Sequence, residues 1–141
     1  MPLLNSIKKH LKTLLFDKIT VEGKKVAYYE GFAPEKAVNS NLIFTAGNIT
    51  IERGAYDSKT AKGYRLTIPI YCNYRGEKTP INDKFAQDVA DIVDKSLNIG
   101  NLVDGYMVMQ CETSSTHVAM NDAKGNYIQN LFNCIVEVVK V

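Results

Sequence analysis

Cysteine is scarce in this chain, and its placement does not match a disulfide framework or a metal site. The 141 residues include three cysteines, at Cys72, Cys111 and Cys134. Their number is odd, their spacing is wide, and no CxxC pair occurs. We therefore expect a protein of a reducing compartment, with no metal or other cofactor, in which each cysteine is a small buried hydrophobe of a different strand.

Long apolar runs are also missing. No stretch approaches the roughly 20 apolar residues that a membrane-spanning helix needs. The opening segment interleaves lysines with leucines, whereas a signal peptide has an unbroken apolar centre and a small-residue cleavage site. No internal repeat or low-complexity segment occurs. We expect one domain over residues 1–141, large enough for a real core and not inserted in a membrane.

Neither sign of charge is in large excess. The net charge of +2 argues for neither a polyacidic nor a polybasic partner. The charges are nevertheless uneven along the chain. Residues 1–75 carry twelve Lys/Arg and six Asp/Glu, which gives +6, and residues 76–141 carry five and nine, which gives −4. This asymmetry suits a protein whose copies meet head to tail.

Catalytic signatures are absent as well. The sequence contains no P-loop, GxGxxG, GxSxG or HExxH motif. Cys111 and His117 leave one alternative open, a small soluble enzyme or ligand-binding domain with a cysteine nucleophile and a histidine base. No flanking signature accompanies them, and we expect a protein without catalytic or cofactor-binding residues.

The opening segment predicts an amphipathic helix. Pro2 fits its first turn, and its lysines fall largely on one side. The apolar residues at helical spacing are Leu3, Leu4, Ile7, Leu11, Leu14 and Leu15. We expect this face to pack on a sheet, and a basic helix lying on a membrane surface is the alternative.

Three strand-like segments follow, at residues 24–32, 42–52 and 64–74, with a connection between the first two. We expect a turn or bulge to interrupt the second of them at Ala46 and Gly47. The third alternates apolar and polar residues over eleven positions. Its Pro69 lacks an N–H group, which indicates an edge strand or a bulge.

A long polar and basic loop, residues 54–63, separates the second and third segments. A tight hairpin needs only two to five residues there. The loop offers nothing obvious to bury.

A second helix is predicted after residue 78. Thr79 can cap it with Pro80 at the first position, or Asn82 can cap a later start. Its apolar face comprises Phe85, Val89, Ile92, Val93 and Ser96. Its acidic edge comprises Asp88, Asp91 and Asp94, which form either a solvated ridge or half of an interface.

The chain ends with a strand at residues 104–112, a polar connection at 113–126 with at most a short strand at 117–120, and a final strand from 127. The last strand is apolar on both faces, which is typical of the middle of a sheet. The order α-β-β-β-α-β-β predicts an α+β fold, with a mixed or mostly antiparallel sheet of about five strands and two helices packed on one face.

This order of elements resembles the tail terminator (tail completion, or tail-to-head joining) proteins of long-tailed bacteriophages and prophages. The resemblance is carried by the opening helix LLNSIKKHLKTLLF, the long polar hairpin loop, the alternating strand YRLTIPIYCNY, the helix DKFAQDVADIVDKSL and the apolar closing strand NLFNCIVEVV. Other head–tail connector, head-closure and minor capsid proteins share much of this pattern. No tube-binding signature is found, and Pro69 interrupts the best strand.

The resemblance implies a non-enzymatic structural virion protein. Such proteins form rings, commonly of six copies, that cap the tail tube, stop its polymerisation and join it to the head connector. Their partners are copies of themselves, the tail tube protein and head connector proteins. They act at the head–tail junction of the virion and are assembled in the host cytoplasm.

The resemblance also gives the long loop a role, as an assembly element. Its backbone, residues 54–63, is expected to be mobile in the free subunit until a neighbouring or tube subunit orders it. Its candidate contact residues are Arg53, Tyr56, Lys59, Lys62 and Arg65. They would face Asp88, Asp91 and Asp94 of an adjacent copy, or line a channel crossed by DNA, with nonspecific electrostatic contact. Reversing the charges of Arg53 and Arg65 together is expected to weaken assembly without unfolding the domain.

Overall fold

The computed structural model describes residues 2–31, 41–45, 49–76, 78–97, 100, 102–122 and 125–141. Its main sheet has the strand order β3-β4-β6-β9-β8-β7, with β5 paired to β6 beside this path. The strands are β3 (Ala27–Glu30), β4 (Leu42–Thr45), β5 (Thr50–Arg53), β6 (Gly63–Tyr74), β7 (Leu102–Val103), β8 (Tyr106–Asp122) and β9 (Gly125–Lys140). Among the described strands only β3 and β4 pair in parallel, so the sheet is mixed and mostly antiparallel, as predicted.

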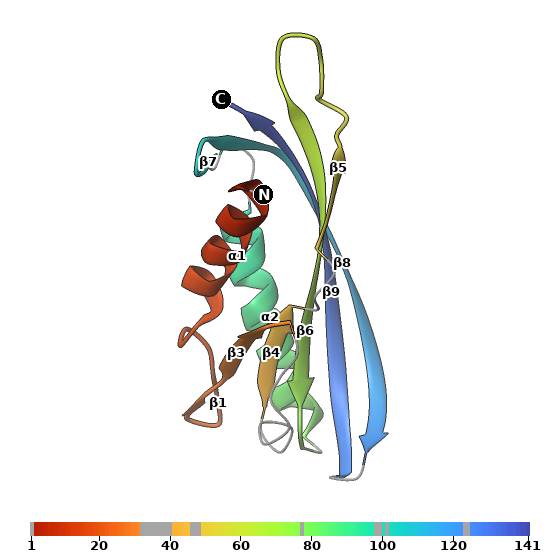
Figure 1. Cartoon of the computed structure of the whole chain (residues 1–141). Helices are drawn as coiled ribbons and strands as arrows, with labels where there is room; N and C mark the ends of the chain where they lie inside the picture. Colours follow the sequence, from red (N-terminus) through yellow and green to blue (C-terminus); the bar gives the residue numbers. More distant parts are fainter. Residues whose placement is uncertain are drawn as a thin grey trace.

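Two helices, α1 (Pro2–Leu15) and α2 (Thr79–Ser96), lie side by side on one face of this sheet (Figure 1). The α+β prediction is therefore confirmed. A separate two-stranded ribbon, β1 (Thr20–Val21) with β2 (Lys24–Lys25), was not predicted, because the sequence pattern joined its second strand to β3. The predicted connection at residues 33–41 lies almost entirely outside the described residues. No described helix has the length and apolar character needed to cross a membrane.

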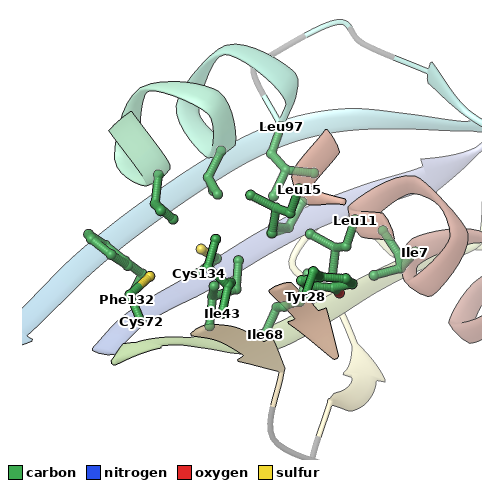
Figure 2. Packing of buried hydrophobic residues seen from close by; sticks show 14 of the residues in the cluster. Ile7, Leu11, Leu15, Tyr28, Ile43, Ile68, Cys72, Leu97, Phe132 and Cys134 are labelled. Carbon is green, nitrogen blue, oxygen red and sulfur yellow. The ribbon is translucent and has the colours of Figure 1, made fainter. Parts of the chain in front are cut away.

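The core fills the space between the helices and the sheet (Figure 2). From α1 it receives Leu3, Ile7, Leu11 and Leu15, all 1% exposed or less. The apolar face of α1 thus packs inside the fold, as predicted, and is not free to lie on a membrane surface. From α2 the core receives Phe85, Val89 and Val93, again on the predicted face.

The start of α2 differs from both capping alternatives. The N-cap position is Lys78, which makes no side-chain capping bond, and Pro80 lies in the first turn. Asn82 lies within the helix and is fully buried. Its side chain accepts a hydrogen bond from Asn130 of β9 and therefore does not act as the helix cap.

Strand β6 is central, so the edge alternative for Pro69 is wrong. It pairs with β9 along its whole length, from Gly63 opposite Val139 to Tyr74 opposite Ile128. On its other side β4 covers residues 70–73 and β5 covers residues 64–67. The turn or bulge predicted at Ala46 and Gly47 lies outside the described residues, and β4 and β5 on either side of it pair with separate parts of β6. Neither of these two described strands pairs with Pro69, so its missing N–H removes no hydrogen bond from either described pairing.

The largest error of the sequence interpretation concerns strand β8. The polar stretch 113–126 was predicted as a connection, but β8 runs unbroken from Tyr106 to Asp122 and pairs with β9 up to Gly125. Residues 112–121 are exposed, so this half of the strand has no apolar face and gives no alternating pattern. Strand β9 lies between β6 and β8, which confirms the prediction of a central last strand.

Candidate functional site

Two hairpins project from opposite ends of the sheet (Figure 1). One joins β5 to β6 through residues 54–62, and the other joins β8 to β9. The first was predicted from the sequence and carries most of the candidate contact residues. The second was not predicted and presents a long strand edge.

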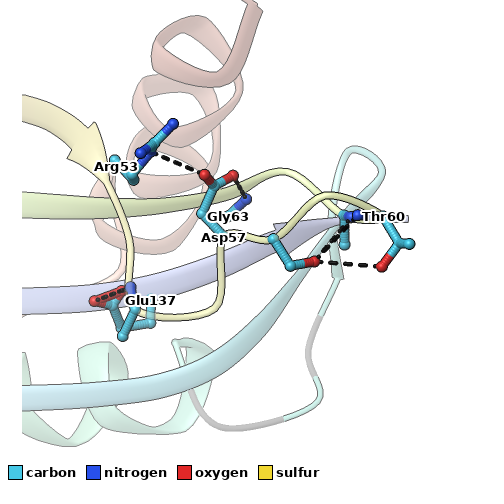
Figure 3. Close-up of polar contacts among 8 residues, drawn as sticks. Arg53, Asp57, Thr60, Gly63 and Glu137 are labelled. Atoms are coloured by element: carbon cyan, nitrogen blue, oxygen red, sulfur yellow. Dashed lines mark hydrogen bonds and ion pairs between the residues drawn. The ribbon is translucent and has the colours of Figure 1, made fainter.

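The loop between β5 and β6 is closed by its own polar groups (Figure 3). Gly54 N–H donates to the Gly63 carbonyl at 3.0 Å, and Gly63 N–H donates to Asp57 Oδ1 at 3.0 Å. Ser58 Oγ accepts from the N–H groups of Thr60 and Ala61. These side-chain to backbone bonds are the kind that Ser and Asp form in turns. The prediction that this loop is mobile in the free subunit stays a prediction.

Both glycines at the base of this loop are required by space. A Cβ on Gly63 would lie 2.5 Å from the backbone nitrogen of Asp57, and one on Gly54 would lie 2.7 Å from the carbonyl carbon of Tyr64. Any larger residue would therefore push the two sides of the loop apart.

Glu137 on β9 fastens the base of the loop to the centre of the sheet. Its carboxylate accepts a hydrogen bond of 2.7 Å from Arg65 Nε and longer bonds from Ala55 N–H. The Glu137 side chain is 6% exposed and that of Arg65 is 43% exposed. The contact with the carboxylate raises the pKa of the Arg65 guanidinium above its ordinary value. Arg65 is thus engaged within its own subunit.

The predicted contact residues of the loop therefore divide into two groups. Arg65 lies on the sheet face opposite the helices and holds Glu137. Tyr56, Lys59 and Lys62 are exposed on the loop, and Arg53 is exposed although its Nε lies 2.9 Å from Asp57 Oδ2. Reversing Arg65 would expel a nearly buried carboxylate from its ion pair, so Arg53 alone is the cleaner site for a charge-reversal test of assembly.

The three acidic residues on the edge of α2 also have different partners. Asp88 pairs with Lys84 at 2.9 Å, and both residues line a groove that the β1–β2 turn borders on its other side. Asp91 accepts a bond of 2.7 Å from Gln87, and Asp94 accepts one of 3.4 Å from Thr113 on β8. Asp94 therefore lies beside the projecting part of β8. No ion pair among the described residues joins this edge to the basic loop of the same subunit.

Cys111 and His117 are not brought together. They lie six residues apart on the same strand, about 20 Å at the rise of a β-strand. Partial burial raises the pKa of the Cys111 thiol, which disfavours a thiolate nucleophile. Among the described residues no three His, Cys, Asp or Glu side chains gather as a metal site. The geometry gives no support to an enzyme built on this pair.

A polar chain links β8, β9 and α2. His117 Nδ1 lies 3.0 Å from Asn130 Oδ1, and Asn130 Nδ2 donates to Asn82 Oδ1 at 2.8 Å. Asn82 and Asn130 are buried, and a groove of about 330 Å³ lies between α2 and these strands, bordered by Gln87, Ser115 and His117. The amide Nδ2 of Asn82 has no hydrogen-bond partner among the described residues. These hydrogen bonds connect the second hairpin to α2.

Comparison with known proteins gives a fold likeness. No protein-family model matches the chain, and no curated protein matches it. Among solved structures it is similar to a chain of the virion of a native gene transfer agent (GTA) particle. The TM-score is 0.52 at 14% sequence identity, over 77% of each chain. The two chains share a fold.

Sequence reasoning missed two residues that organise these hairpins. Glu137 stood in a strongly apolar strand, and a lone carboxylate in such a strand could have pointed to a buried ion pair. Asn82 was taken only as a capping residue. Its spacing of three from Phe85, and of seven from Val89, places it on the apolar face of the helix and was the available signal.

Proposed function

We propose that this chain is a structural virion protein of the tail terminator type. The observation that carries the proposal is the fold shared with a chain from a virion. The order of the elements supports it, because the opening helix, the long hairpin and the central last strand match the pattern of tail terminators. In this proposal the chain is not an enzyme, in keeping with the separation of Cys111 from His117.

The mechanism is geometric. One contact between unlike surfaces of neighbouring copies repeats around an axis and closes into a ring, commonly of six copies. The ring sits on the end of the tail tube, blocks the addition of further tube subunits, and presents its other side to the head connector. Its location is the head–tail junction of the virion, after assembly in the host cytoplasm.

The projecting hairpin gives the ring a contact element. Its base is fixed to the sheet by Glu137, while Tyr56, Lys59 and Lys62 extend beyond the sheet into solvent. A fixed base and an exposed basic tip suit a contact with a neighbouring copy or a tube subunit, and with DNA passing through the ring by nonspecific attraction.

The test is to delete this chain from the genome that produces the particle and to measure tail tubes by electron microscopy. A terminator predicts tubes of uncontrolled length that carry no heads, and restoration of both defects by the intact chain. Tubes of normal length that still lack heads would favour a head-closure or connector role. Unchanged, infectious particles would contradict the proposal.

A further inference from the structure

The β8–β9 hairpin has an inner and an outer part that are held differently. Strand β6 pairs with β9 as far as Tyr74 opposite Ile128, and beyond that level no described strand other than β8 pairs with β9 (Figure 1). The described residues beyond it, 120–122 and 125–127, form a two-stranded outer ribbon. A two-stranded ribbon by itself is only marginally stable in water.

The inner part is tied to the other elements of the fold. Asn130 Nδ2 donates to Asn82 of α2 at 2.8 Å, and Gln129 Nε2 donates to Asn73 Oδ1 of β6 at 3.0 Å. Ile128 is half-buried and packs against the core. The outer ribbon supplies no described side chain to the buried core, so the ties to the rest of the fold stop at its base.

We propose that the outer ribbon opens as a unit of its own while the rest of the fold stays closed, and that the stacking of Arg75 on Tyr127 holds it shut. The Arg75 guanidinium lies 4.5 Å from the centre of the Tyr127 ring. Such a cation–π contact at a partly exposed site is weak, so it limits the opening without preventing it. The inference concerns the single chain and does not depend on the proposed ring.

Arg75 is well placed for this role because the end of β6 is fixed. The Arg75 backbone N–H donates to Asn41 Oδ1 at 2.7 Å. Tyr74 is 2% exposed, and a Cβ on Gly76 would collide with the Tyr74 ring. The backbone is therefore packed closely on both sides of Arg75. Its side chain reaches the ribbon from a part of the fold that stays closed when the ribbon opens.

The base of the β5–β6 hairpin lacks this separation. Opening it would break the ion pair between Arg65 and the nearly buried Glu137 carboxylate, at the centre of the sheet. Opening the outer ribbon breaks a few backbone pairs and one cation–π contact, and it exposes no described core side chain. Proteins open locally in such cooperative units, and elements that move in binding are drawn from the least stable of them.

Amide hydrogen exchange of the full chain, measured residue by residue by NMR, tests the separate opening. Gly63→Ala strains the base of the other hairpin and leaves every described contact of the ribbon in place. Amides of the central strand β9 near Val136 should then exchange at least about fivefold faster. Amides that bond across the outer ribbon should keep their rates. Equal acceleration of both sets would overturn the proposal.

The unchanged chain in low concentrations of urea gives a second answer that needs no variant. Opening of the ribbon exposes little surface, so exchange of its amides should hardly depend on urea, whereas exchange near Val136 should rise steeply. The same steep dependence in both sets would mean that the ribbon opens only with the whole fold.

Tyr127→Leu and Arg75→Met test the contact that holds the ribbon. Each should speed exchange of the ribbon amides about two- to fivefold, which corresponds to one exposed cation–π contact. The double variant should exchange no faster than the faster single variant, because both changes remove the same contact. Arg53→Met, on the other hairpin, is the matched control and should leave these rates unchanged. Unchanged rates in Tyr127→Leu, or effects that multiply in the double variant, would overturn the role of Arg75.

Discussion

The two hairpins of this protein are built on opposite principles. The β5–β6 hairpin has a short strand and a nine-residue loop, residues 54–62, and its base is tied to β9 through Glu137. The β8–β9 hairpin has almost no loop, because pairing continues to Asp122 opposite Gly125, and its outer half is exposed strand. The first hairpin is held by a few specific polar contacts, whereas the second is held by continuous backbone pairing. Polar sequence therefore has two structural outcomes in one chain.

The largest effect is expected at the base of the first hairpin, from Arg65→Met. The change leaves the 6% exposed Glu137 carboxylate without its ion partner, and an uncompensated buried charge is strongly destabilising. Thermal unfolding followed by circular dichroism should show a larger loss of stability than Gly63→Ala or Asn130→Ala causes.

Two further variants isolate the role of the charge. The double change Arg65→Met with Glu137→Met should regain most of the stability, because no unpaired charge remains. Arg53→Met removes an ion pair in which the Arg53 side chain is 84% exposed and Asp57 keeps its hydrogen bond from Gly63 N–H, so it should cost less than Arg65→Met. A double variant as unstable as the single one would show that Glu137 does not act through its charge.

Gly63→Ala should destabilise the protein by about 1–3 kcal/mol, because the new methyl group would lie against the backbone of Asp57. Ser114→Ala, at an exposed position of the second hairpin, should change stability by no more than about 0.5 kcal/mol. Urea unfolding of both variants measures the contrast. Equal midpoints would mean that the loop base is not closely packed.

Asn130→Ala should cost about 1–3 kcal/mol, since it leaves the buried Asn82 amide without its partner. This loss tests whether the second hairpin also depends on a polar contact at its base. His117→Ala removes only the exposed end of the same chain and should cost less. Urea unfolding of both variants measures the two losses of stability. A larger loss from His117→Ala than from Asn130→Ala would contradict this account of the His117–Asn130–Asn82 contacts.

The smallest effect concerns the cysteines. Burial raises the pKa of the Cys134 thiol to about 12 and also raises that of Cys72, so both are protonated at pH 8. The thiolate is the reactive form, so neither should be alkylated by iodoacetamide in the folded protein, while Cys111 reacts slowly. Mass spectrometry of labelled peptides measures this. Labelling of Cys134 at the same rate as in urea would contradict the burial.

The regular parts of the fold were predictable because burial produces a period. The face of α1 with Ile7 and Leu11, the alternation of β6, and the face of β9 with Val136 and Val138 each follow from one side of the element meeting the core. The long loop was predictable because its glycines and polar residues show no hydrophobic periodicity and lie between two clear strands.

The exposed half of β8 was not predictable in this way. Thr113, Ser115 and His117 face the helix side of the sheet beyond most of the core, so neither face is apolar. Their strand conformation follows from pairing with β9, which is a long-range contact that local pattern does not encode. The ion pair between Arg65 and Glu137 was not predicted for a related reason. The two residues are seventy-two positions apart in the sequence, and the pairing of β6 with β9 brings them together.

The native mass of the purified chain across a range of concentrations is the decisive measurement for the proposed ring. Light scattering after size exclusion should show a shift with concentration from the single chain toward a closed ring, near six chain masses. Microscopy of that fraction should then show particles with a central hole. A mass that stays at one chain over the whole range, both alone and in the presence of tail tubes, would contradict the ring.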